Sequence, residues 1–599
     1  MARHLYIRKE TKGLPIKKLE KLGSGSYGKV YECKIGKRRY AMKVIKNNDG
    51  FMDLTALREI DSLVSLKSAK RVAKLYEVIF NEDDVTLIME LGVDDLQNYV
   101  KQHVLSEEQV RQYAQQLCEA VYECVQHNII HRDIKTYNVV ITRKGIAKLI
   151  DFGFARSDTC IAELDTTLTN MMFTLWYRAP EVLLRHPYTE KADIWALAMT
   201  IAGLISDDGD ALFRPKVRNR DLDKKSRRMT ERKALLDEIF TNFGTPIEDA
   251  MTNSPNWDPE YDDIPVTSKA RIFDYLAKRF PDVDPKLIDL LSWMFMIDPD
   301  DRPDIRQVLL HPYFTREDVP RLLNCQEKLF KRERIPPRPK YTDLSDYQED
   351  RKRFIEWLYD AIYVQKISNR AVYFLTLQLY DMIKVPSTTY IGSSQGDPSE
   401  EDSNTQFNIY QAACMIIAVS LRGLKELPIE EYLWYFRLGP NPEDSEFLEE
   451  LEDETEMIEM IEEAVIDIII QLKGNLYMST SWDFLFEFNY NEHPAVKVIS
   501  EEVLAYLVET DLVYREKPSE LAQLSIEYSE GIYFDDWRRI FGTRIEDSQP
   551  SISNSTNRDA YGEGKGFDPI KEEIVNEVKK EWSNSPKRNS GTKSVSVPR

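Results

Sequence analysis

The spacing of apolar residues divides the chain into a strand-rich start, a long helical middle and a second helical half. Residues 17–90 show short apolar runs around one helical segment, and residues 105–315 have a mostly helical pattern. From Tyr347 onward glycine is sparse and apolar residues return at helical spacing. The first apolar face there is formed by Phe354, Ile355, Leu358, Ala361 and Ile362. The pattern predicts a mixed domain of helices and strands followed by an all-helical one.

Further helices are expected where the apolar period recurs in the second half, near 371–384, 408–421, 456–472 and 496–508. Two polar insertions, 393–404 and the acidic 441–456, interrupt this pattern. Residues 316–345 carry prolines and charges, which is typical of a linker. Residues 546–599 are polar and poor in apolar side chains, so we expect a disordered tail.

Composition narrows the class of protein. A chain of 599 residues is too long for one core, so two to four domains are expected. The formal net charge of -21 argues against direct nucleic-acid or membrane-surface binding. The six cysteines form no CxxC pair, which favours a reducing compartment. No apolar run approaches membrane-spanning length, and we therefore expect a soluble intracellular protein.

A glycine-rich segment near the start indicates a phosphate-binding loop. Residues 22–30 read LGSGSYGKV, a GxGxxGxV pattern between two strand-like segments. Such a loop alone is weak evidence, because tight hairpins use the same residues. Here the next strand carries Lys43 in AMKV, and the helical segment that follows offers Glu59 as its ion partner. The three parts in this order predict a nucleoside triphosphate site.

The run HRDIKTYN, followed a short distance on by DFG, supplies the reactive groups. Asp133 would orient a substrate hydroxyl and accept its proton, with Lys135 near the transferred phosphoryl group. Asn138 and Asp151 would hold Mg²⁺, which prefers hard oxygen ligands and bridging phosphates. A single loop aspartate more often caps the backbone, but the whole set in this order favours phosphoryl transfer.

These motifs resemble those of eukaryotic-type protein kinases over about the first 315 residues. The resemblance implies an α+β bilobal protein kinase fold, with an N-lobe at about 16–91 and a C-lobe at about 92–315, and with ATP and Mg²⁺ as cofactors. Lysine two residues after the catalytic aspartate is similar to the serine/threonine class. The resemblance also implies that Glu181 pairs with Arg302 and that Asp193 braces the catalytic loop.

The same resemblance assigns a set of residues to the ATP site. They are Leu22, Gly23, Gly25, Gly28, Val30, Ala41, Lys43, Met89, Glu90, Gly92, Asp95 and Val140. Met89 would be the gatekeeper, and Glu90 and Gly92 would offer backbone groups to adenine. Val140 would form the floor below adenine, and Asp95 would reach the ribose.

Within this class the chain resembles the cyclin-dependent kinases. Residues 53–60 (DLTALREI) are similar to their PSTAIRE helix, residues 174–181 (TLWYRAPE) match the end of their activation segment, and FGTP at 243–246 resembles a C-lobe motif. The resemblance implies protein substrates with Ser or Thr followed by Pro, a role in cell-cycle or transcription control, and activation by a cyclin. Phe173 replaces a smaller residue of the family, which leaves the proline preference open.

Three arginines occupy the family's phosphate-gathering positions: Arg58, Arg132 and Arg156. Guanidinium groups that converge would repel one another, so the arrangement implies a phosphate that orders the activation segment. Thr169 matches the activating threonine of the family, and an ordinary exposed loop threonine is the alternative. Ser26 and Tyr27 match the inhibitory phosphorylation positions of the glycine loop.

The second half resembles a cyclin box in three successive segments. They are 351–358 (RKRFIEWL), 375–381 (LTLQLYD) and 411–418 (QAACMIIA). Ser420 stands where the family has a lysine, and Glu462 and Glu463 follow the acidic insertion. The resemblance implies an all-α cyclin-like domain over 346–545 that activates the kinase domain (1–315) of its own chain.

Two other interpretations stay open. The C-terminal half could be an adaptor for an outside protein, or the chain could be a pseudokinase scaffold. The second is opposed by the intact set of Lys43, Glu59, Asp133, Asn138 and Asp151. Fusion of kinase and cyclin is unusual in cellular proteins, which would suit a large DNA virus as the source and the cytoplasm or nucleus of its host as the location.

Overall fold

The computed structural model describes most of the first half of the chain and parts of the second. The described residues are 5–9, 16–25, 28–47, 51–157, 174–186, 188–206, 209–215, 224–246, 257–314, 319–323, 325–334, 351, 354–355, 358, 370–383, 400–422, 454–476, 478–488, 500, 504 and 517–526. All of them lie in the first of two units defined by backbone contacts, Met1–Tyr533.

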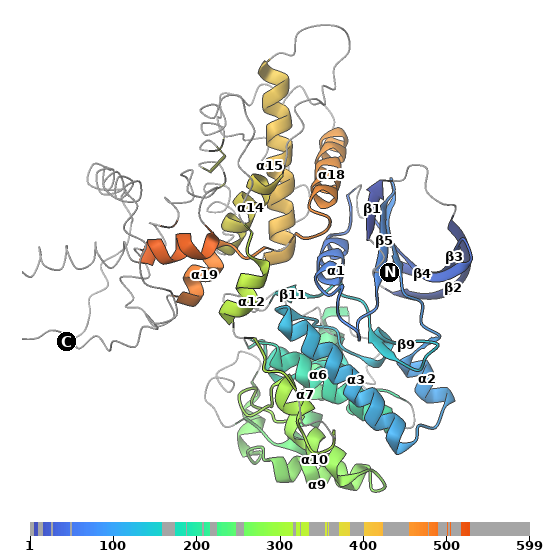
Figure 1. Ribbon diagram of the computed structural model, residues 1–599. Helices are drawn as coiled ribbons and strands as arrows, with labels where there is room; N and C mark the ends of the chain where they lie inside the picture. The colour runs from blue at the N-terminus through green and yellow to red at the C-terminus, as the bar shows by residue number, and fades with distance from the viewer. Residues whose placement is uncertain are drawn as a thin grey trace, which may run out of the picture. The chain divides into compact units, whose positions relative to one another are not determined.

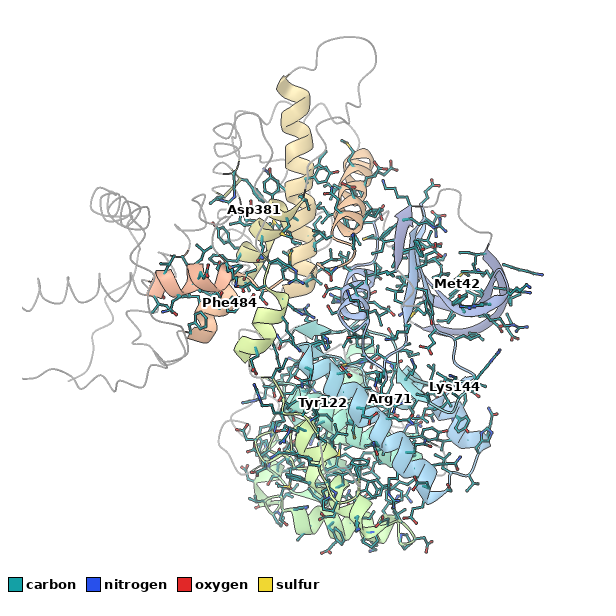
Figure 2. All side chains as sticks on the ribbon, in the orientation of Figure 1. Met42, Arg71, Tyr122, Lys144, Asp381 and Phe484 are labelled. Atoms are coloured by element: carbon teal, nitrogen blue, oxygen red, sulfur yellow. The ribbon has the colours of Figure 1, made fainter. Side chains whose placement is uncertain are left out.

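The N-terminal lobe is a six-stranded sheet with one helix beside it (Figure 1). The elements are β1 (Tyr6–Lys9), β2 (Ile16–Gly25), β3 (Gly28–Ile35), β4 (Arg38–Lys46), α1 (Leu54–Ser65), β5 (Leu75–Phe80) and β6 (Asp84–Met89). The strand order is β1-β5-β6-β4-β3-β2, with β1 parallel to β5 and the other neighbours antiparallel. Cys33, Met42, Ile79 and Ile88 form a buried cluster in this lobe, and Met42 is labelled in Figure 2.

Helix α1 is buried on nearly every face. The Asp53 side chain caps its N-terminus by accepting a hydrogen bond from the Thr55 N–H at 2.8 Å. A helix on the surface of a globular domain usually buries a single stripe. Here every residue from Thr55 to Val64 is buried, because α1 lies against β5 on one side and the C-terminal helix α15 (Glu400–Arg422) on another.

The C-terminal lobe is built mainly of helices around a hydrophobic centre. Its helices are α2 (Leu96–Gln102), α3 (Glu107–Gln126), α5 (Pro180–Leu184), α6 (Lys191–Leu204), α7 (Lys224–Phe243), α9 (Lys269–Arg279), α10 (Pro285–Met294) and α11 (Ile305–Leu309). Five short strands are described in this lobe: β7 (Asp94–Asp95), β8 (Ile129–Ile130), β9 (Val139–Ile141), β10 (Ala147–Leu149) and β11 (Arg156–Ser157). Helix α6 is apolar all round and buried, and its Trp195 packs edge-on against Phe243 and Phe295.

Helices also make up much of the C-terminal region that the structure describes. Its helices are α12 (Cys325–Arg332), α14 (Arg370–Met382), α15, α18 (Glu454–Gln471) and α19 (Ser481–Phe488). Helices α14 and α15 pack together, α15 also contacts α18, and both α12 and α14 contact α19. None of the helices in the described ranges is both long and apolar enough to span a bilayer.

Two boundaries differ from the sequence prediction. Helix α15 begins at Glu400, inside the stretch 393–404 that was predicted as a polar insertion. The low hydrophobicity of this stretch hid the start of the helix from a prediction based on the spacing of apolar residues. Helix α12 lies within the predicted linker 316–345. The predicted tail and most of the predicted helix 496–508 fall outside the described residues.

Candidate active site

Antiparallel pairing brings the glycine loop next to the lysine strand. Gly23 pairs with Val30, and Val30 pairs in turn with Lys43 on β4. Gly25 faces Gly28 where β2 and β3 meet at the loop. A side chain cannot fit at Gly28, because a Cβ there would lie 2.4 Å from a backbone carbonyl oxygen of β4. Four of the predicted ATP-site residues thus line the path toward Lys43.

The connection between the lobes brings together the residues predicted to contact adenine. Ala41 on β4 pairs with Met89 at the end of β6. Gly92 lies against Val140, and a Cβ on the glycine would be 2.7 Å from the valine Cβ. The Glu90 N–H donates to a carbonyl of the loop before β5. Adenine would therefore be offered the carbonyl oxygen of Glu90 rather than its N–H.

Two predicted ATP-site residues lie at the edges of this region. Leu22 on β2 is 48% exposed. Asp95 is the N-cap of α2 and accepts hydrogen bonds from the Asn98 N–H at 2.8 Å and from the Asn98 amide at 2.7 Å. Burial raises the pKa of Asp95. The structure thus gives Asp95 a capping role, and its contact with ribose stays a prediction.

Lys43 lies between two carboxylates, as predicted for Glu59. Its ammonium nitrogen is 2.5 Å from Glu59 Oε2 and 2.9 Å from Asp151 Oδ1. Burial alone would lower the pKa of Lys43, but the carboxylates of Asp151 and Glu59 raise it overall. Burial raises the pKa of Glu59 to about 7, although Lys43 opposes this. Burial alone would also raise the pKa of Asp151, but Lys43 outweighs this effect and holds the pKa of Asp151 below its usual value. The site keeps a cation where phosphate oxygens would lie.

Asp193 of α6 braces the catalytic loop through two backbone bonds. Its carboxylate accepts from the N–H groups of His131 at 2.6 Å and Arg132 at 2.9 Å. Burial raises the pKa of Asp193 to about 7, with these two hydrogen bonds opposing the shift. The His131 ring lies edge-on to Phe152, and its Nε2 is 3.1 Å from the carbonyl oxygen of Ile150. Arg132 has a positive φ of 69°, which only a well-braced loop sustains.

Asp133 is held from both sides by polar neighbours. Its Oδ2 accepts from Lys135 Nζ at 2.6 Å and from the Asn138 amide at 2.8 Å. Its Oδ1 accepts from the Thr174 hydroxyl at 2.7 Å, and that hydroxyl also accepts from Lys135 at 2.8 Å. Thr174 entered the sequence prediction only as part of the TLWYRAPE run, so this contact was not predicted. The geometry fixes a carboxylate that can orient and deprotonate a hydroxyl.

Asn138 and Asp151 suit a magnesium ion by the chemistry of their donor atoms. The amide nitrogen of Asn138 donates to Asp133, so its amide oxygen is the atom available for a cation. No cluster of three or more metal-ligating side chains forms among the described residues. Magnesium needs few protein ligands, because waters and substrate phosphates complete its octahedral shell. These two side chains would hold the metal, which would neutralise charge on the phosphates.

Residues 16–314 match the family model of the protein kinase domain. This range contains the glycine loop, the Lys43–Glu59 pair, the catalytic loop and the DFG turn. The chain therefore carries a protein kinase domain and is a protein kinase, and this domain generally uses ATP and a divalent metal. The bilobal fold predicted for this part is confirmed, as is the buried pair of Glu181 and Arg302, whose two N–O distances are 2.9 and 3.1 Å.

The three predicted phosphate-gathering arginines are buried next to the DFG turn. Arg58 Nε donates to the Gly153 carbonyl at 2.9 Å, and Arg132 Nη1 donates to the Phe154 carbonyl at 3.5 Å. Arg156 follows on β11 and lines the same cavity as Arg58. The residues predicted to be phosphorylated fall outside the described part of the chain: Ser26, Tyr27 and Thr169.

Within the described residues, hydrogen bonds join helix α1 to the C-terminal region at Leu54, Arg58 and Asp61. The Ser420 hydroxyl donates to the Leu54 carbonyl at 3.2 Å. Arg58 Nη1 donates to the Ser420 carbonyl at 3.2 Å, and the Leu476 N–H donates to Asp61 Oδ1 at 3.0 Å. Ser420 is the residue at the position where the predicted resemblance to a cyclin box would place a lysine. Ser420 contacts the start of α1, and the hydrogen bonds are spread along α1 from its first residue to its eighth.

Further contacts join α18 and the turn after it to the N-terminal lobe, among them the Lys9–Glu463 ion pair at 3.2 Å. Asn47 donates to Glu462 Oε1 at 3.1 Å, and burial raises the pKa of Glu462 to about 7. Gly474 has a φ of +73°, and a Cβ there would lie 2.9 Å from a side-chain carbon of α1. Glycine is needed at this position both for the left-handed backbone and for the close approach.

Proposed function

We propose that the chain is a serine/threonine protein kinase of the cyclin-dependent type whose C-terminal helical region is its built-in activator. The observation that carries the proposal is the position of α1. This helix holds Glu59 2.5 Å from Lys43 while residues 420 and 476 of the C-terminal region are hydrogen-bonded to it. In the family that the sequence resembles, a cyclin performs this task on the equivalent helix.

A buried ion pair supports a cyclin-like C-terminal region. Arg351 and Asp381 come from two different segments of the resemblance to a cyclin box. They form a two-pronged pair with N–O distances of 2.8 and 2.7 Å, and their side chains are only 3% and 1% exposed. Breaking such a pair leaves an uncompensated buried charge. Its presence favours a specific packing of these helices over a loosely associated adaptor.

The proposed reaction is phosphoryl transfer from ATP to a Ser or Thr hydroxyl of a protein, with Pro as the preferred next residue. Asp133 orients that hydroxyl and accepts its proton, while Lys135 neutralises charge on the transferred group. Lys43 orients the phosphates of ATP, and bound magnesium supplies further charge neutralisation. Phosphorylated Thr169 would bind Arg58 and its two partner arginines and so order the activation segment.

The test compares the full chain with a chain that ends at residue 335, without any added cyclin. We expect kcat/KM on a Ser-Pro peptide to be at least about tenfold higher for the full chain, since the C-terminal region shifts α1 toward its paired position. Equal activity of the two chains would rule out a built-in activator. A matched Ser-Ala peptide measures the proline preference in the same assay.

Two further arms separate the rival interpretations. Adding a fragment of residues 340–545 to the shortened chain should restore part of its activity if the region is an activator. An adaptor for an outside protein would bind without stimulating the kinase. A pseudokinase would show no transfer by the full chain on any peptide, although it could still bind nucleotide.

A further inference from the structure

Helix α12 is anchored to the kinase domain at its N-terminal side. The Tyr122 hydroxyl of α3 donates to the Pro320 carbonyl at 3.0 Å (Tyr122 is labelled in Figure 2). Gln126, one turn further along α3, donates to the Arg321 carbonyl at 3.1 Å and accepts from the Leu323 N–H at 2.9 Å. The chain therefore enters α12 along a fixed path on α3.

The C-terminal side of α12 is anchored to the C-terminal region. The Arg332 carbonyl accepts from the Ser479 N–H at 3.3 Å, and Glu333 forms a parallel bridge with Ser479. Glu333 Oε1 also accepts from the Ser519 N–H at 2.8 Å. Gln378 of α14 donates to the carbonyl of the residue after Glu333 at 3.2 Å. Contacts at both ends are more than a passive tether requires.

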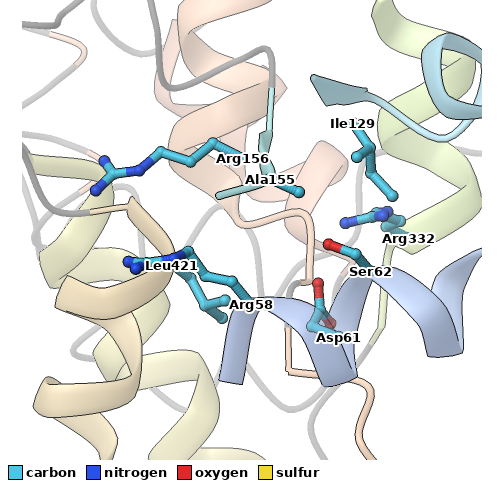
Figure 3. Close-up of a pocket in the computed structure, with 8 residues that line it drawn as sticks. All are labelled: Arg58, Asp61, Ser62, Ile129, Ala155, Arg156, Arg332 and Leu421. Carbon is cyan, nitrogen blue, oxygen red and sulfur yellow. The ribbon is translucent and has the colours of Figure 1, made fainter. Parts of the chain in front are cut away.

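The Arg332 side chain reaches a small cavity beside α1 (Figure 3). The walls of this cavity include Asp61 and Ser62 of α1, Arg156 of β11 and Leu421 of α15. Its volume is about 20 Å³, which has room for about one water and is too small for a metabolite. The residues around the cavity therefore pack against one another and interact through their charges instead of binding a metabolite. Arg332 is the contribution of α12 to this junction of kinase and C-terminal helices.

We propose that α12 is a rigid brace and that Arg332 positions α1, which extends the proposed activation by the C-terminal region. A flexible tether only raises the local concentration of its partner, to roughly millimolar. A helix bound at both ends also fixes the orientation of the partner and removes the entropy that docking would lose. The orientation of α1 decides whether Glu59 meets Lys43, so the brace acts on the reaction through that pair.

The first experiment keeps the tether and removes the helix. In the full chain, residues 325–332 are replaced by a Gly/Ser sequence of equal length, which preserves the reach of the linker. We expect kcat/KM to fall about tenfold, because α1 returns to a mixture of positions. Activity equal to that of the unaltered chain would show that α12 is only a tether. If the chain ending at residue 335 were as active as the full chain, the proposed activator role itself would fail, whatever the Gly/Ser chain does.

The second experiment uses point variants of the full chain. Arg332→Ala is compared with Lys331→Ala, which removes the same charge from an exposed position in the same turn. We expect Arg332→Ala to lower kcat about fivefold and to raise the KM for ATP, with Arg332→Lys recovering part of the loss. Lys331→Ala should match the unaltered chain. Equal effects of the two alanine variants, or a loss of activity that follows only a lower Tm, would overturn the positioning role.

Discussion

Replacing Asp133 with asparagine is expected to lower kcat about 10³-fold, within the range that general-base catalysis contributes. Asparagine keeps the size of the side chain, but its single amide oxygen can replace only one of the two carboxylate oxygens, so it can still accept from Lys135 or from Thr174 but not from both. It cannot take the proton of a substrate hydroxyl. The KM for ATP should change little, because Lys43 and the residues near adenine are untouched. Steady-state kinetics on a Ser-Pro peptide, with ATP and peptide varied separately, measures both quantities.

The matched control for this change is Asp282→Asn, which alters an exposed aspartate in a turn of the C-terminal lobe. It should leave kcat and both KM values unchanged. A kcat for Asp133→Asn within tenfold of the unaltered chain would contradict the role given to Asp133. Unfolding must be followed as well, because Asn138 and Lys135 both donate to this carboxylate. A variant with an unchanged Tm and a lost kcat separates catalysis from folding.

Much of the active site is predictable because its groups follow short, local patterns. Lys43 lies on a strand and Glu59 on a helix with clear apolar periods, so their side-chain directions follow once the two elements pack. Asp133 and Asn138 belong to one loop whose length sets their separation. The resemblance to protein kinases also correctly placed Asp193 beside this loop. Thr174 was missed because a threonine hydroxyl gives no signal of its partner until the activation segment folds back.

The contacts of α1 with the C-terminal region could not be read from the sequence. The Ser420 hydroxyl and the Leu476 N–H bind a carbonyl and a carboxylate that are hundreds of residues away in the chain. Backbone donors and acceptors occur at nearly every residue, so each of these bonds leaves no mark on the identity of the residue that supplies its backbone group. Strand β1 is a similar case. Four residues are too few to show a period, and its pairing depends on β5, which lies far along the chain.

Replacing Lys43 with methionine is expected to lower kcat/KM about 10³-fold, as for loss of a charged group that contacts the phosphates of ATP. Glu59→Gln should lower it about 10²-fold, because the lysine loses its orienting partner. The double variant should be no worse than Lys43→Met alone, since residues that act as one unit are not additive. An additive loss would show that the two side chains act independently. Lys46→Met, at an exposed position on the same strand, is the control.

In the same set of variants, the effects on stability should differ from the effects on activity. Lys43→Met leaves Glu59, whose side chain is 1% exposed, and Asp151 without their shared ammonium group. Removing one partner of a buried pair costs about 3 kcal/mol, whereas removing both charges costs much less. We therefore expect a lower Tm for Lys43→Met and a substantial recovery of Tm in the double variant, with activity still lost. A double variant less stable than Lys43→Met would contradict this account.

The pH profile provides an independent test of the same pair. Burial raises the pKa of Glu59 to about 7, so its ionised form, which orients Lys43, is present mainly above that pH. Between pH 6 and pH 8 the kcat/KM of the unaltered chain should therefore rise as Glu59 loses its proton. Gln has no proton to lose, so Glu59→Gln should lack this acid limb. If the limb remained in Glu59→Gln, it would belong to another group such as Asp193, whose pKa burial also raises to about 7. A flat profile for the unaltered chain would mean that the carboxylate stays ionised throughout, with Lys43 outweighing the effect of burial.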